Sequence, residues 1–119
     1  MIEGLVFSRI NMKGLMASNR PLPPEIGSRL GEVAAFCRQN GIARMALFGS
    51  TLRGENGLDS DLDLLVEFEK GRTPGFRFFE LQDELSMIFG KTVDLETPGF
   101  LAPDVRARVV AEARVLYAA

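Results

Sequence analysis

Histidine and tryptophan are absent from this chain of 119 residues, and cysteine occurs only once, as Cys37. Without histidine the chain cannot perform Ser-His-Asp or Cys-His catalysis, and it cannot build a zinc site that uses histidine. A lone cysteine forms neither an internal disulfide nor a cysteine-only zinc site, which favours a reducing, cytoplasmic location. Any metal ion must therefore be bound by oxygen, the donor typical of magnesium, calcium and manganese sites.

Long apolar runs are also missing, so no segment reaches the roughly 20 residues that a membrane-spanning helix needs. The first residues lack the basic, apolar and cleavage regions of a signal peptide. The sequence therefore gives no reason to expect membrane association. We expect a single domain over residues 21–119, preceded by an N-terminal extension, residues 1–20, that forms a short strand or is disordered.

Charge is distributed unevenly along the chain. Residues 1–54 carry seven basic and three acidic side chains, whereas residues 55–119 carry seven basic and thirteen acidic ones. The isoelectric point is about 5.2. A nucleic-acid-binding domain typically shows a basic stripe and a high isoelectric point, so no direct nucleic-acid binding is expected.

A helix is predicted to begin at Pro24, because proline suits a first helical position that needs no N–H partner. Apolar residues recur after it at helical spacing, and Gly41 is placed to end the helix in a left-handed conformation. A buried strand over Ala43–Phe48 and a loop over Thr51–Ser60 follow. The apolar stripe of the helix consists of Ile26, Leu30, Val33 and Cys37.

The next part of the chain has the pattern of a β-α-β unit. Asp61–Phe68 and Thr92–Glu96 alternate polar and apolar residues as strands do. Between them, Phe78, Leu81, Leu85 and Ile88 mark a helix that Gly90 can end. Such a unit leaves its two strands parallel. The predicted fold is α/β (α+β), a small mixed sheet packed by helices.

A last helix is predicted after Pro103, because Val105, Val109, Ala113 and Leu116 recur at helical spacing. Apolar residues on more than one of its faces favour burial against a partner protein.

The carboxylates of Asp61 and Asp63 are two positions apart and therefore share one face of their predicted strand. Two carboxylates this close repel each other unless a cation or a proton lies between them. If the strand containing Asp94 lies beside this one, a third carboxylate joins the group, and three acids without histidine suit one or two magnesium ions. For the pair alone, a solvent-exposed polar face is an equally good interpretation.

Gly49 and Ser50 follow directly after a predicted buried strand. Their backbone N–H groups and the serine hydroxyl can bind an anion at such a position. A plain turn is the better interpretation of the dipeptide by itself. Its combination with Asp61, Asp63 and Asp94 instead predicts a phosphate site beside a metal site.

These motifs resemble a known family. The stretches Leu47–Ser50, Arg53–Glu55 and Asp59–Val66 are similar to the signature of the minimal nucleotidyltransferases, small members of the polymerase-beta-like nucleotidyltransferase superfamily. Further similarity covers Gly71–Gly75 and Val93–Leu95, and the resemblance spans about residues 22–119.

The resemblance implies a palm-like nucleotidyltransferase core that transfers AMP from ATP with two magnesium ions. By the family pattern, Asp61 and Asp63 hold both ions, and Asp94 holds the catalytic ion and assists deprotonation of the acceptor hydroxyl. Gly49 and Ser50 contact the nucleotide phosphates. Arg53 neutralises phosphate charge or pairs with the acidic loop.

The family also implies a biological setting. Minimal nucleotidyltransferases commonly act as antitoxins beside a HEPN-class ribonuclease toxin, and several are thought to transfer AMP to a tyrosine of that toxin. Two alternatives remain open: a non-catalytic antitoxin that neutralises by binding, and a small-molecule nucleotidyltransferase that modifies an antibiotic. The sequence also leaves open whether the chain forms a homo-oligomer.

Overall fold

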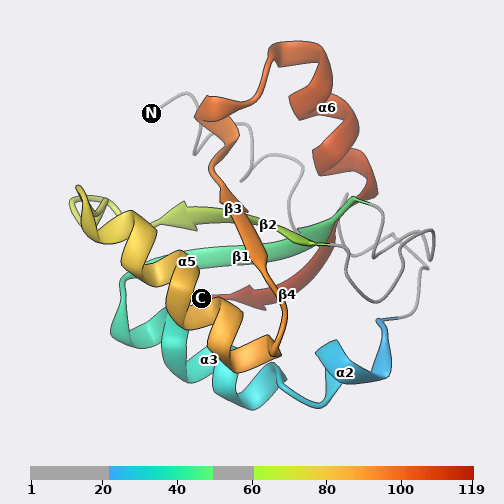
Figure 1. Cartoon of the computed structure of the whole chain (residues 1–119). Helices are drawn as coiled ribbons and strands as arrows, with labels where there is room; N and C mark the ends of the chain where they lie inside the picture. Colours follow the sequence, from blue (N-terminus) through green and yellow to red (C-terminus); the bar gives the residue numbers. More distant parts are fainter. Residues whose placement is uncertain (1–21, 50–60) are drawn as a thin grey trace.

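A four-stranded sheet in the order β3-β2-β1-β4 forms the centre of the fold (Figure 1). The computed structural model describes residues 22–49 and 61–119. Along these segments the elements are α2 (Pro24–Gly27), α3 (Leu30–Gln39), β1 (Ile42–Phe48), β2 (Leu62–Phe68), α5 (Arg77–Phe89), β3 (Val93–Glu96), the 3-10 helix η2 (Pro98–Phe100), α6 (Pro103–Glu112) and β4 (Arg114–Ala118). This mixed α/β architecture confirms the predicted fold class.

The predicted β-α-β unit is confirmed as β2, α5 and β3. The two strands are parallel, and Leu62 is the register partner of Val93. Gly90 ends α5 with φ +66°, a left-handed conformation that glycine adopts without steric cost. The other strand pairs, β1 with β2 and β1 with β4, are antiparallel. The sheet is therefore mixed, with its parallel pair at one edge.

The helix predicted from Pro24 is divided into α2 and α3. The chain leaves the helical path at Ser28 and Arg29, after Gly27. Glycine and serine both favour the helix less than alanine does, which explains the interruption. In the predicted apolar stripe, Ile26, Val33 and Cys37 are nevertheless buried, and Leu30 is half-buried. Gly41 has φ +69° just beyond the end of α3.

The prediction of one continuous C-terminal helix is wrong beyond Glu112. Residues Arg114–Ala118 form β4, where Tyr117 is the register partner of Met45 on β1. β-branched and aromatic residues favour strands. The segment pairs with the edge of β1, and the spacing of apolar residues along the sequence does not reveal such a pairing. Leu116 is buried in the chain's own core. The apolar residues of the predicted C-terminal helix therefore no longer indicate burial against a partner protein.

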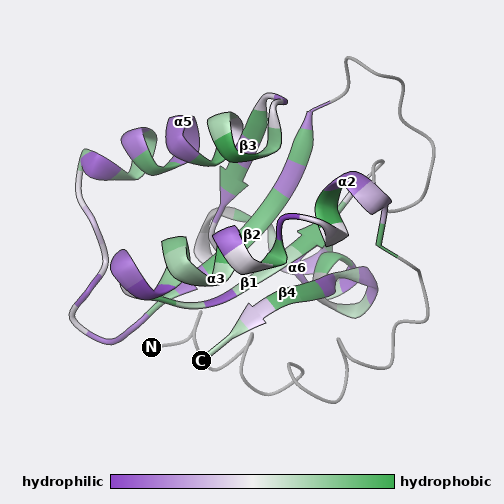
Figure 2. Ribbon diagram, turned by 90° about the horizontal axis from the view of Figure 1, so that it is seen from below, coloured by the Kyte–Doolittle hydropathy of each residue, from purple (hydrophilic) through white to green (hydrophobic). Residues whose placement is uncertain are grey.

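The helices lie on both faces of the sheet (Figures 1 and 2). α3 and α5 pack on one face over the main core, which includes Leu47, Leu64 and Leu85. α6 packs on the opposite face over a smaller cluster of Ala46, Leu65, Val109 and Ala113. Among the described residues, no helix is long and apolar enough to cross a membrane.

Candidate active site

Asp63 and Asp94 come from the two parallel strands and are partners in register. Neighbouring strands lie about 4.8 Å apart, and side chains at paired positions point to the same face of a sheet. The structure therefore brings these two predicted site residues together. Asp61 lies one residue before β2 and is exposed, whereas Asp63 is half-buried and Asp94 is exposed.

Gly49 lies directly after β1, against the side chain of Asp63. Phe48, the residue before it, is the register partner of Asp63. Gly49 has φ +83°, and a Cβ atom built on it would lie 3.1 Å from Cγ and 3.2 Å from Cβ of Asp63, with the carboxylate oxygen Oδ2 closer still. Only glycine allows the backbone to approach this carboxylate so closely. The predicted phosphate-binding turn thus begins beside the predicted metal ligands.

Ser50 and Arg53, the other two residues predicted to contact phosphate, lie outside the described residues. Their roles remain predictions.

Glu96 is a member of the acidic group that the sequence analysis did not assign. It lies two residues after Asp94, on the same side of β3, and is half-buried. Burial raises the pKa of the Glu96 carboxyl, and repulsion by Asp94, a hydrogen bond with Asp94 and repulsion by Asp63 raise it further. The alternation of Thr92–Glu96 was the signal that could have identified Glu96, because it placed Glu96 on the polar face with Asp94.

Two side chains of α5 fix β3 beside β2. The Val93 N–H donates to Ser86 Oγ at 2.9 Å, and the Leu95 N–H donates to Gln82 Oε1 at 2.9 Å. An edge strand otherwise exposes such N–H groups. The two bonds flank Asp94 along the strand, so α5 holds the backbone that positions this carboxylate.

The acidic group has oxygen donors only, which suit a hard cation such as magnesium. Across residues 22–49 and 61–119, however, no three Asp, Glu or Cys side chains are arranged to hold one metal ion. Asp63 and Asp94 supply two neighbouring carboxylates, and glycine at position 49 lets the backbone of the turn approach one of them. The site fits a cation whose remaining ligands come from a bound phosphate group.

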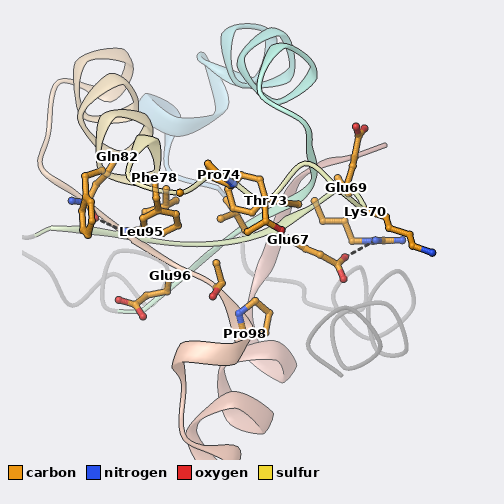
Figure 3. Close-up of a pocket in the computed structure, with 18 of the residues that line it drawn as sticks. Glu67, Glu69, Lys70, Thr73, Pro74, Phe78, Gln82, Leu95, Glu96 and Pro98 are labelled. Carbon is orange, nitrogen blue, oxygen red and sulfur yellow. Dashed lines mark hydrogen bonds and ion pairs between the residues drawn. The ribbon is translucent and has the colours of Figure 1, made fainter. Parts of the chain in front are cut away.

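A cavity of about 1150 Å³ opens beside Asp94 and Glu96 (Figure 3). It extends from these carboxylates along β2 to the loop Glu69–Gly75 and to Phe78 and Phe79 of α5. Chemically, the site can bind a metal-complexed phosphate near Gly49 and Asp63 and offers a carboxylate base, Asp94, at the mouth of a large groove.

The sequence profile of the nucleotidyltransferase domain family matches residues 30–117. The protein adenylyltransferase MntA of Thermococcus cleftensis is 37% identical over 73 residues, which cover 60% of this chain and 72% of that relative. The matched residues include the strands β1, β2 and β3. They also include Gly49, Asp63 and Asp94.

Solved structures with the same fold include one provisionally described as a minimal nucleotidyltransferase. It is 41% identical, has a TM-score of 0.64, and the match covers 74% of this chain and 89% of that one. A chain from the complex of the tri-AMPylated HEPN toxin of Shewanella oneidensis with an MNT antitoxin has a TM-score of 0.60 at 20% identity, with 79% and 73% of the two chains covered. At that identity, the second comparison shows the fold alone.

Proposed function

Because the chain belongs to the nucleotidyltransferase domain family, we propose that it transfers AMP from ATP to a hydroxyl group of a partner protein. The observation that carries this proposal is the pairing of Asp63 with Asp94 in register, with the Gly49 backbone packed against Asp63. This arrangement supports a site in which a triphosphate-binding turn and a carboxylate base would lie within one short segment of the sheet. The relative from Thermococcus cleftensis, named a protein adenylyltransferase, supports AMP as the transferred group.

In the proposed reaction, the acceptor oxygen forms a bond to the α-phosphorus of ATP. The bond from that phosphorus to the oxygen that bridges to the β-phosphate breaks, and pyrophosphate leaves with the bonding electrons. The acceptor proton passes to Asp94, whose exposed carboxylate lines the groove from which an acceptor would approach. The turn at Gly49 binds the phosphates and holds the α-phosphorus in line with the acceptor.

Asp61 and Asp63 would hold two magnesium ions together with the phosphate oxygens of ATP, and Asp94 would be a ligand of one of them. Bound magnesium neutralises the charge that develops on the phosphates and makes the acceptor hydroxyl easier to deprotonate.

The proposed acceptor is a tyrosine hydroxyl of a HEPN-class toxin, for which the chain would act as the antitoxin. The chain from the Shewanella oneidensis complex shares the fold, and that complex contains an AMPylated HEPN toxin together with its MNT antitoxin. The groove beside Asp94 is large enough to admit an aromatic side chain.

The test is to incubate the purified chain with ATP labelled at the α-phosphate, magnesium and the HEPN-class protein encoded beside its gene. We expect label on a tyrosine of that protein and loss of its ribonuclease activity. The variant Asp63→Asn should bind the partner but transfer no label. If this variant still silences the partner fully, the chain is a binding antitoxin and AMP transfer is not its function.

A further inference from the structure

A groove of about 500 Å³ separates α3 from α5. Both helices pack on the same face of the sheet (Figures 1 and 2). Arg77, the first residue of α5, donates to the side-chain oxygen of Asn40, just after α3, at 3.0 Å, so the two helices run in opposite directions. We call this surface the α3–α5 groove. Its lining includes Glu32, Ala35 and Phe36 of α3 and Glu84, Met87 and Ile88 of α5.

The floor of the α3–α5 groove is apolar. Phe36 belongs to the main core, and the half-buried Ile88 packs against that core. Met87 stands at the edge of the groove and is 81% exposed. In the described part of the chain, the large apolar side chains that remain exposed all belong to α5 or its N-cap, namely Phe76, Phe79 and Met87. Exposed apolar residues that gather on one helix beside a groove are typical of an interaction surface.

The rims of the α3–α5 groove are acidic. Glu32 lies on the α3 side and Glu84 on the α5 side, and among the described residues no basic side chain lines the groove. Glu32 is paired with Arg29 at 2.8 Å, and Glu84 with Arg77 at 3.6 Å, while Arg77 also pairs with Glu80 at 2.9 Å. Exposed pairs of this kind contribute little to stability. Basic side chains of a ligand can therefore take over both rim carboxylates.

The shape and charge of the groove select its occupant. Along α3 the lining extends from Glu32 to Gln39, which corresponds to about 10 Å or two helical turns. An amphipathic helix that lays its apolar side into a groove of this kind is a recurrent mode of protein recognition. A second copy of this chain fits poorly, because a symmetric pair of grooves would bring Glu32 and Glu84 against the same two acids.

The α3–α5 groove and the candidate active site lie on opposite faces of the sheet. Val93 and Leu95 of β3 pack in the main core with α3 and α5. Alternate residues of a strand point to opposite faces, so Asp94 faces away from the groove. A partner held in the groove leaves the acidic group accessible, and binding there can be separated from chemistry at Asp94.

We propose that the α3–α5 groove is a protein-binding site for an amphipathic helix of a partner protein, with arginines or lysines along the borders of its apolar side. The apolar side of that helix covers Phe36, Met87 and Ile88, and its basic residues pair with Glu32 and Glu84. This assignment goes beyond the proposed function, because it requires no AMP transfer.

The first test measures binding of a designed helix. Two end-blocked fluorescent peptides share the same leucine-rich side, flanked by arginines in one and by glutamates in the other. Each is titrated with the full chain in the absence of ATP, and fluorescence polarisation is followed. We expect the arginine peptide to bind at least 10-fold more tightly than the glutamate peptide.

The variant Ala35→Arg fills the groove with a basic side chain. Ala35 is exposed on α3, one turn after Glu32, so the new side chain pairs with that carboxylate and repels a basic helix. Ala107→Arg is the matched control, because Ala107 is an exposed alanine of α6, on the opposite face of the sheet, and the net charge changes equally. We expect arginine-peptide binding to weaken at least 10-fold in Ala35→Arg and by less than twofold in Ala107→Arg.

Two further variants separate the apolar from the charged contribution. Met87→Ser removes an exposed apolar side chain and should weaken both peptides by a similar factor of at least threefold. Glu84→Gln removes one rim charge, while Arg77 keeps its 2.9 Å pair with Glu80, so it should weaken the arginine peptide alone. Circular dichroism checks that each variant is folded.

Absence of binding to the arginine peptide, equal binding of the two peptides, or equal effects of Ala35→Arg and Ala107→Arg would each overturn the assignment. Sedimentation of the full chain tests the other occupant: a dimer that Ala35→Arg dissociates would assign the groove to a second copy instead.

AMP transfer to the partner protein, measured on the same preparations, separates this assignment from the proposed function. If the unmodified chain binds the arginine peptide as expected but transfers no AMP, the groove assignment stands and the proposed function fails. If it transfers AMP but binds neither peptide, the proposed function stands and the groove assignment fails.

Discussion

Asp94 on β3 is the register partner of Asp63 on β2, and the two carboxylates share one face of a parallel strand pair. A shift of β3 by one residue would turn Asp94 toward the opposite face. The N–H groups on either side of Asp94 donate hydrogen bonds to Ser86 and Gln82 of α5, and these bonds oppose such a shift. The geometry of the candidate site therefore depends on α5 as well as on the strands that carry the acids.

Replacement of Asp94 should separate nucleotide binding from chemistry. Asp94→Asn keeps the size of the side chain but removes its charge and its capacity to accept a proton. Because Asp94 is exposed, the variant should fold normally. We expect ATP affinity within a few fold of the unmodified chain and AMP transfer reduced by a factor on the order of 10² or more.

Calorimetry and label transfer on one preparation, with folding checked by circular dichroism, measure both quantities. Transfer near the original rate would make Asp94 a surface acid without a role. A parallel fall in binding and transfer would place Asp94 in the nucleotide site.

Replacement of both Asp61 and Asp63 by asparagine should abolish magnesium-dependent ATP binding. The two carboxylates lie two positions apart, one directly before β2 and one within it, and carboxylates this close repel each other unless a cation offsets their charge. Titration calorimetry with and without magnesium should show that the metal dependence present in the unmodified chain is lost. Unchanged affinity for magnesium and ATP in the double variant would contradict the assignment.

The central unit β2-α5-β3 could be predicted from the sequence, because strand alternation and the helix-ending Gly90 are local signals. The meeting of Asp63 with Asp94 followed from that unit. Strand β4 could not be predicted, since Arg114–Ala118 becomes a strand only through pairing with β1, far away in the sequence. The cavity beside Asp94 and Glu96 was equally hidden, because the residues that line it come from segments far apart in the sequence.

Gly49→Ala should damage the site through backbone geometry. A side chain there meets the Asp63 carboxylate and occupies a position with φ +83°, a conformation that costs other residues about 1–3 kcal/mol. We expect a lower melting temperature and weaker ATP binding. The control is Gly31→Ala, since Gly31 is helical and open, and alanine there should raise stability by about 0.5–1 kcal/mol. Equal melting temperatures for the two variants would show that Gly49 tolerates a side chain.

Cys37 should resist thiol reagents in the folded protein. Its side chain is fully buried, and burial raises the pKa of the Cys37 thiol to about 12, although nearby Arg38 opposes the shift. The thiolate is the reactive form, and at pH 8 it is almost absent in the native state. Labelling with Ellman's reagent should therefore follow the rate of unfolding and become rapid in denaturant. Fast labelling at pH 8 without denaturant would show that the packing around α3 is open.

The variant Gln82→Met should test whether α5 positions Asp94. Methionine retains the length of the side chain, but its sulfur is a much weaker acceptor than the Gln82 amide oxygen for the Leu95 N–H, and Leu95 is 2% exposed. A buried N–H without a partner costs about 1–3 kcal/mol, so the free energy of unfolding should fall by that amount. AMP transfer should fall more than ATP affinity, because the displaced strand carries Asp94, whereas the nucleotide turn begins at Gly49, directly after β1. Gln82→Glu restores an acceptor for the Leu95 N–H and should recover most of the lost stability, as measured by urea denaturation. If Gln82→Met matches the unmodified chain in both stability and transfer, the bond to Leu95 does not hold β3 in place.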